Sequence, residues 1–207
     1  MRNLSKDDCK NYLKNGVLSK PFLDSKFVFQ KIMNDYEHKI QIHKNYTKLQ
    51  SIYNWIHNNV TFSKDNNFKA INRFQRNAKE IWESKLTASC TDYAILFATF
   101  ARQLNIPTSI LHTAEKNWLK SLKSGETSLH LGHSFCECYY NGKWMLVDPT
   151  NKKLLTNYNS EELILPYKVG PGNIYIQYYR GLDLEKRQDT TTHNLWMDNL
   201  CKNLTVK

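Results

Sequence analysis

Three short stretches of this sequence place a cysteine, a histidine and an aspartate where they could together catalyse acyl transfer: Ser89-Cys90-Thr91-Asp92-Tyr93-Ala94, Gly132-His133-Ser134-Phe135 and Trp144-Met145-Leu146-Val147-Asp148-Pro149-Thr150. A nucleophilic cysteine must be a thiolate, and a nearby imidazole must hold and return its proton. A carboxylate then fixes the tautomer of that imidazole. The residue types therefore make Cys90, His133 and Asp148 the candidate catalytic residues.

Cys90 is predicted to be the first residue of a helix. Ser89 is a good N-cap residue, and Asp92, three positions later, completes the acidic version of a capping box. The apolar residues that follow lie on more than one helical face, which predicts a buried central helix stopped at Asn105 and Pro107. Unpaired N–H groups and the helix dipole at its N-terminus favour a thiolate. The alternative is that Cys90 is only a small buried hydrophobe.

A hairpin signal relates His133 to Asp148. Asn141-Gly142 is the strongest two-residue turn signal, and it lies between the strand-like residues 135–140 and 143–147. The register that it predicts pairs Tyr140 with Lys143, Tyr139 with Trp144, Glu137 with Leu146, Phe135 with Asp148, and His133 with Thr150. Alternation then puts His133 and Asp148 on one face as diagonal neighbours within side-chain reach. The alternative is a surface histidine and an aspartate that only caps a turn.

The same register sends two other cysteines, Cys136 and Cys138, to the opposite face, where we expect them either in the core or facing a partner. A zinc site built from these two with His130 and His133 would need ligands from both faces of one strand, and the spacing matches no usual pattern. We therefore do not expect a zinc site here.

Composition narrows the function classes. The chain has 207 residues, enough for one domain with a sizeable core, and its five cysteines form no small-domain disulfide framework. The net charge of +10 comes from scattered basic residues, with no nucleic-acid-binding motif. No apolar run is long enough to cross a membrane, and the N-terminus has no secretory-signal pattern. These features predict a cytoplasmic protein that binds neither nucleic acid nor membranes.

The expected organisation is a helical N-terminal extension over residues 1–44 packed on a domain over residues 45–207. Within that domain the core motifs occupy residues 46–150, and a C-terminal strand and helix occupy residues 151–207. The expected elements are a helix from about residue 46 to 59, a polar surface connection over 63–75, a strand over 106–113, an active-site loop or lid over 114–131, a strand over 174–179, and a closing helix around Leu195, Trp196 and Leu200.

The three stretches, in this order and spacing, resemble the transglutaminase-like superfamily. Residues 90–94, Ile106-Pro107-Thr108, 132–135 and 144–150 match its pattern, and residues 55–60 resemble the segment before its core. The resemblance implies an α+β, papain-like fold in which a central helix carrying the cysteine packs on an antiparallel sheet carrying the histidine and aspartate. Many members have glycine two positions before the cysteine, where this chain has Ala88.

The resemblance also implies an activity. Cys90 would attack an amide or related acyl group of a protein or peptide substrate and form a thioester, which water or an amine resolves. His133 would carry the proton, and Asp148 would orient His133. This chemistry would need neither a metal nor an organic cofactor. The alternative is a non-catalytic interaction module that retains the fold, and a third reading is a basic nucleic-acid-associated protein.

Overall fold

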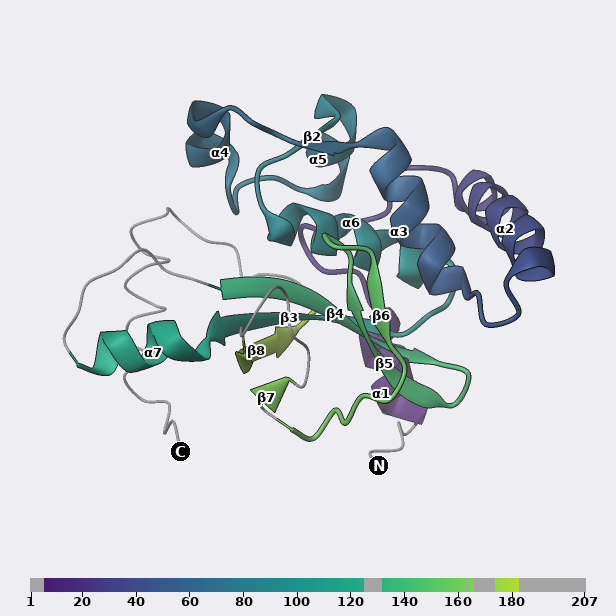
Figure 1. Ribbon diagram of the computed structural model, residues 1–207. Coiled ribbons are helices and arrows are strands. Elements are labelled where there is room, and N and C mark those ends of the chain that lie inside the picture. Colours follow the sequence, from purple (N-terminus) through teal and green to yellow (C-terminus); the bar gives the residue numbers. More distant parts are fainter. Residues whose placement is uncertain (1–5, 125–131, 163, 166–173, 183–207) are drawn as a thin grey trace.

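The computed structural model describes residues 6–124, 132–162, 164–165 and 174–182, and it is an α+β protein, as the sequence predicts. Its main sheet has six antiparallel strands in the order β6-β5-β4-β3-β8-β7 (Figure 1). The strands are β3 (Thr108–Glu115), β4 (Gly132–Tyr140), β5 (Lys143–Asp148), β6 (Lys153–Leu155), β7 (Ile164–Leu165) and β8 (Tyr175–Gly181).

Most of the helices gather over one face of this sheet (Figure 1). The helices are α1 (Lys6–Leu13), α2 (Ser25–Ile42), α3 (Lys48–Asn59), α4 (Asn66–Asn72), α5 (Ala78–Ser84), α6 (Cys90–Gln103) and α7 (Lys116–Lys123). A separate two-stranded parallel sheet joins β1 (Thr61–Phe62) to β2 (Leu86–Thr87). Because β2 leads directly into α6, this small sheet fixes the approach of the chain to Cys90.

The helix α6 lies at the centre of the fold, as its apolar pattern predicts. Every residue from Thr91 to Arg102 is buried, and the helix is surrounded by α2, α3, α5 and the sheet. It ends before Asn105, which adopts a left-handed conformation with φ 57°. Asparagine tolerates this conformation better than most residues, so it stops the helix at little cost.

The sheet separates two apolar clusters because its strands alternate. One cluster holds α6, α3 and α2 together with Cys136 and Cys138 of β4, so both cysteines are in the core as predicted. The other cluster, on the opposite face, contains Phe135 and Trp144. There Tyr12 of α1 packs edge-on against Trp144, with ring centroids 5.8 Å apart. Both faces of β4 are therefore covered.

Several elements differ from the expected ones. The polar connection over 63–75 contains the short helix α4, started by the Asp65 carboxylate, which accepts the N–H of Asn67. The segment 114–131, predicted as a loop, continues β3 and then forms α7, because the Glu115 carboxylate accepts the N–H of Trp118. Residues 125–131 and the predicted closing helix around 195–200 lie outside the described residues. The boundary at residue 44 stays a prediction.

The β4–β5 hairpin has the predicted register. Tyr140 pairs with Lys143, and the pairing continues to Cys136 with Val147. Beyond that pair β4 and β5 are not paired with each other. The predicted pairs Phe135–Asp148 and His133–Thr150 would continue the same register but are not among the observed pairs. Asn141 and Gly142 have φ 51° and 77°, the positive values that this turn demands.

Gly142 offers a direct test of the turn, since a Cβ added there would meet no atom within 4 Å. Gly142→Ala should therefore lower the free energy of unfolding only through backbone strain, by about 1 kcal/mol. Thermal and chemical denaturation measure it. Gly142→Asn is the matched control and should cost less, because asparagine tolerates positive φ; equal losses for the two variants would contradict the explanation.

Candidate active site

The structure brings the three predicted site residues together. Cys90 is the first residue of α6, His133 lies near the start of β4, and Asp148 is the last residue of β5. The His133 Nε2 atom is 3.0 Å from Asp148 Oδ1. The thiol of Cys90 and the imidazole of His133 are hydrogen-bond partners. Since Nε2 faces the carboxylate, Nδ1 is the ring nitrogen available to the sulfur.

A turn at the end of β5 holds the Asp148 carboxylate in place. Its Oδ1 accepts the backbone N–H groups of Thr150 and Asn151, each at 3.0 Å, and its Oδ2 accepts the side-chain amide of Asn151 at 2.8 Å. Asp148 is only 1% exposed. Burial alone would raise the pKa of Asp148, but the hydrogen bond and charge of His133, with the Asn151 donors, hold it below its usual value.

The charges of the site support a thiolate–imidazolium pair. Burial by itself would raise the pKa of the Cys90 thiol, but the charge and hydrogen bond of His133, together with hydrogen bonds from Ser134, hold it below its usual value. Burial would likewise lower the pKa of His133, whereas the Cys90 thiolate and the Asp148 carboxylate raise it to about 10. At neutral pH His133 is therefore cationic, and its charge favours the thiolate.

The predicted capping box at Ser89 is wrong in its contacts. Ser89 occupies the N-cap position, but its side chain makes no cap hydrogen bond. The Asp92 carboxylate instead accepts the N–H of Ala88 at 2.7 Å and pairs with the guanidinium of Arg76. The reason is burial: Asp92 is fully buried, and a buried carboxylate needs both a hydrogen-bond donor and an opposite charge, which the N–H of Ala88 and the guanidinium of Arg76 supply. Asp92 thus still fixes the turn before Cys90, through Ala88.

Cys90 lines a pocket of about 380 Å³. As a residue it is half-buried, whereas Cys136 and Cys138 are buried, and burial raises the pKa of both of these thiols, to about 12 for Cys138. The pocket is lined by Phe62, Arg73, Phe74, Ser89, Cys90, Thr91, His112, Thr113, Gly132, His133, Ser134, Thr150, Asn151 and Tyr178.

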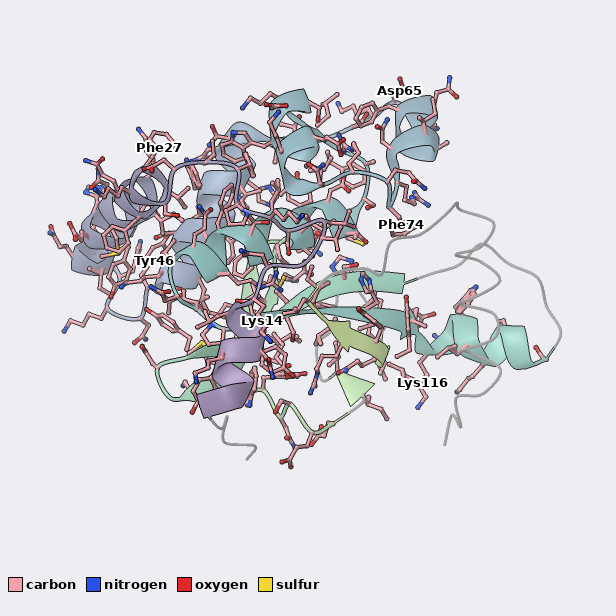
Figure 2. All side chains as sticks on the ribbon, turned by 180° about the vertical axis from the view of Figure 1, so that it is seen from behind. Lys14, Phe27, Tyr46, Asp65, Phe74 and Lys116 are labelled. Carbon is pink, nitrogen blue, oxygen red and sulfur yellow. The ribbon has the colours of Figure 1, made fainter. Side chains whose placement is uncertain are left out.

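The loop after α4 forms one wall of this pocket. Phe74 in that loop has φ 64°, a left-handed conformation that is unfavourable for an aromatic residue. In Figure 2 Phe74 lies below α4, on the side toward the sheet. The exposed ring of Phe62 in β1 and the exposed side chain of Arg73 stand in the same wall. Sequence reasoning missed this wall, because nothing local marks these residues as pocket residues.

His57 is a second residue that sequence reasoning missed. Its Nε2 is 2.8 Å from the carbonyl oxygen of Pro149, next to the Asp148 turn, and its ring stacks on Tyr93 with centroids 4.5 Å apart. Burial lowers the pKa of His57, outweighing the Pro149 hydrogen bond. A neutral His57 that donates from Nε2 ties α3 to the turn carrying Asp148. Its histidine-carbonyl contact joins residues 92 apart in sequence, so no local signal could have found it.

Within the part of the chain that the structure describes, no cluster of three histidine, cysteine or carboxylate residues could hold a metal ion. In the same residues, no helix has both the length and the apolar character needed to cross a membrane.

This arrangement is that of a cysteine-enzyme-like fold, and comparison with known proteins identifies the family. The family model described as the transglutaminase-like superfamily matches residues 34–149, more than half of the chain. The chain belongs to the transglutaminase-like superfamily. A comparison with curated proteins finds no significant match.

A solved structure supports the same fold. The crystal structure of a "putative cysteine protease" from Cytophaga hutchinsonii superposes with a TM-score of 0.51 at 18% sequence identity. The match covers 87% of this chain and 48% of that one, so the chain spans about half the length of the structure it matches.

The buried pair of Arg76 and Asp92 makes a stability prediction. Arg76→Met would leave the carboxylate buried without its cation and should lower the free energy of unfolding by about 3–5 kcal/mol. Arg76→Met combined with Asp92→Asn removes both charges and should recover the part that is due to the unpaired charge. Chemical denaturation of the wild type, both single variants and the double variant measures this coupling; additive losses would contradict it.

Proposed function

We propose that the protein is a cysteine-dependent enzyme that acts on an amide or related acyl group through a thioester on Cys90. The observation that carries the proposal is the continuous chain from Cys90 through His133 to Asp148, with Cys90 and His133 both in the lining of a pocket. Structural cysteines are usually buried and have raised pKa values, as Cys136 and Cys138 do. Cys90 differs from both in exposure and in the direction of its pKa.

In the first half-reaction the Cys90 thiolate attacks the acyl carbon and forms a carbon–sulfur bond. The carbonyl oxygen takes the negative charge of the tetrahedral intermediate. The backbone N–H of Cys90 belongs to the first turn of α6, which has no intrahelical acceptor, so it can donate to that oxygen. The imidazolium of His133 then gives its proton to the leaving amine as the carbon–nitrogen bond breaks, which leaves a thioester and a neutral imidazole.

In the second half-reaction the neutral His133 removes a proton from the acceptor, which attacks the thioester and releases the thiolate. Asp148 keeps the imidazole oriented through both steps and stabilises its cationic form. Water as acceptor gives hydrolysis, as in a protease, deamidase or amidase, and an amine as acceptor gives amide transfer. A protein or peptide is the substrate we propose, in keeping with a pocket walled by aromatic side chains.

The competing proposal is a non-catalytic interaction module. It would keep the fold and the buried Asp148 turn while Cys90 stayed chemically inert. The lowered pKa of Cys90 and the imidazolium beside it favour the enzyme, because a binding module has no need of an ionised thiol.

Alkylation separates these two proposals. Iodoacetamide should label Cys90 much faster than Cys136 or Cys138, and the rate should stay high below pH 7, because the His133 imidazolium beside the thiol favours the thiolate. Peptide mapping by mass spectrometry follows each cysteine, and Cys90→Ala removes the fast phase. A folded protein whose Cys90 does not react at pH 6–7 would sink the catalytic proposal.

Activity profiling identifies whether water or an amine accepts the acyl group from the thioester. Glutamine-donor peptides with a labelled amine report amide transfer, and release of ammonia or of a cleaved peptide without the amine reports hydrolysis. Cys90→Ala must abolish either signal. If wild-type protein with a reactive Cys90 turns over no donor in either arm, the substrate class proposed here is wrong although the nucleophile is real.

The Asp148 carboxylate sets the upper pH limit of the activity. The pKa of His133, raised to about 10, means that activity should fall as pH rises through that value, because the imidazole loses the proton that the leaving amine needs. Asp148→Asn removes a hydrogen bond and a charge that raise this pKa, so the upper limb should move to lower pH, with a rate loss on the order of 10²–10⁴. Asp65→Asn, at the exposed N-cap of α4, is the control and should leave the profile unchanged.

A further inference from the structure

Two hydroxyl groups and a second histidine form a hydrogen-bonded network beside Cys90. Ser134 follows His133 in β4, so strand alternation directs its side chain toward α6, where the next residue on that face, Cys136, contacts the carbonyl of Ala94. Ser134 is only 2% exposed. Its hydroxyl and its backbone N–H both act on the Cys90 thiol and lower its pKa, and both residues line the same pocket.

Two further side chains contact the Ser134 hydroxyl. Thr91 Oγ1, one residue after the nucleophile, is 2.9 Å from Ser134 Oγ, and His112 Nδ1 in β3 is 3.0 Å from the same atom. Thr91 is fully buried and His112 is 3% exposed. All three side chains line the pocket that contains Cys90. None of these contacts belongs to the Cys90–His133–Asp148 chain.

Counting protons fixes the direction of these hydrogen bonds. A serine hydroxyl has one proton to donate and two lone pairs with which to accept. A thiolate can only accept, and a hydrogen bond to an ionised acceptor is stronger than one between neutral groups. The single Ser134 proton is therefore best placed on Cys90. Its two lone pairs then take the hydroxyl proton of Thr91 and the Nδ1 proton of His112, so that the hydroxyl is fully used.

We propose that Ser134 is a further catalytic residue, whose hydroxyl donates to the Cys90 thiolate, and that Thr91 and His112 are positioning residues that hold this hydroxyl in the donating orientation. The proposal rests on the proposed function of Cys90. It adds a donor to the sulfur that is independent of His133. The donor stabilises the thiolate before the acyl group arrives and again when the thiolate leaves the thioester.

Other charged groups near the site also influence the ionisation of Cys90. His133 from β4, with Asp148 behind it, faces the sulfur directly. Arg73 lines the pocket, and the buried Arg76–Asp92 pair lies behind the turn at Ala88. The variants below leave all of these groups in place.

The test is the pH dependence of Cys90 alkylation by iodoacetamide without any substrate. Ser134→Ala removes the hydroxyl donor, so at pH 6 Cys90 should react roughly tenfold more slowly than in the wild type. At high pH, where both thiols are ionised, the variant should react at least as fast, because a more basic thiolate is intrinsically more nucleophilic. A misfolded site would not give this crossing of the two profiles.

The roles of His112 and Thr91 are tested with substitutions that remove their hydrogen-bonding groups and with one that keeps an N–H donor. His112→Leu and Thr91→Val should each move the profile in the same direction as Ser134→Ala but by less. His112→Asn, which can place an N–H where Nδ1 stands, should restore most of the wild-type profile. Thr99→Val is the matched control, because it removes another buried hydroxyl of α6, which donates to the carbonyl of Ile95.

The outcomes separate this proposal from the proposed function. If wild-type Cys90 reacts at low pH and Ser134→Ala has the same profile, the role of Ser134 is overturned while the nucleophile stands. An NMR spectrum in which neutral His112 carries its proton on Nε2 overturns the direction of the network. If wild-type Cys90 is inert, the proposed function itself fails and this proposal falls with it.

Discussion

The ion pair between His133 and Asp148, with Nε2 and Oδ1 3.0 Å apart, is the interaction on which the candidate site depends. A buried imidazole is ordinarily neutral, and a thiol beside it would then stay protonated. The Asp148 carboxylate reverses both tendencies, because its charge favours the imidazolium and the imidazolium favours the thiolate. The carboxylate can do this only because three hydrogen-bond donors of its own turn satisfy it inside the protein. The electrostatics around Cys90 thus depend on the turn that follows β5.

The rest of the fold holds the residues of this ion pair, and Cys90 beside it, in place through a hairpin and a helix. The hairpin turn at Asn141 sets the register of β4 against β5 and hence the distance between His133 and Asp148. The helix α6, enclosed by other elements, brings Cys90 to the same end of the sheet. His57 links the turn after β5 to α6, since it contacts the carbonyl of Pro149 and stacks on Tyr93. The site is therefore held by the core itself, with one wall contributed by a loop.

The parts that could be predicted from the sequence are those governed by local rules. The two residues Asn141 and Gly142 are enough to predict the turn and the strand register. The apolar pattern of residues 93–104 is enough to predict a buried helix. The contacts that escaped prediction join distant parts of the chain. Arg76 redirects Asp92 away from the expected cap, and His57 reaches Pro149, because buried polar groups take whichever partner the tertiary structure supplies. The left-handed Phe74 has no local signal at all.

Neighbouring residues of β4 lie on opposite faces of the sheet, which restricts where related chains can differ in length. His133 lies with Phe135 on one face, where their rings are 4.7 Å apart, and Ser134 lies with Cys136 on the face covered by α6. A single inserted or deleted residue between the turn and Gly132 would exchange these faces and put the histidine under the helix. Related chains should therefore differ in length before β4 or at the hairpin turn, while the spacing from residue 132 to residue 140 should stay constant.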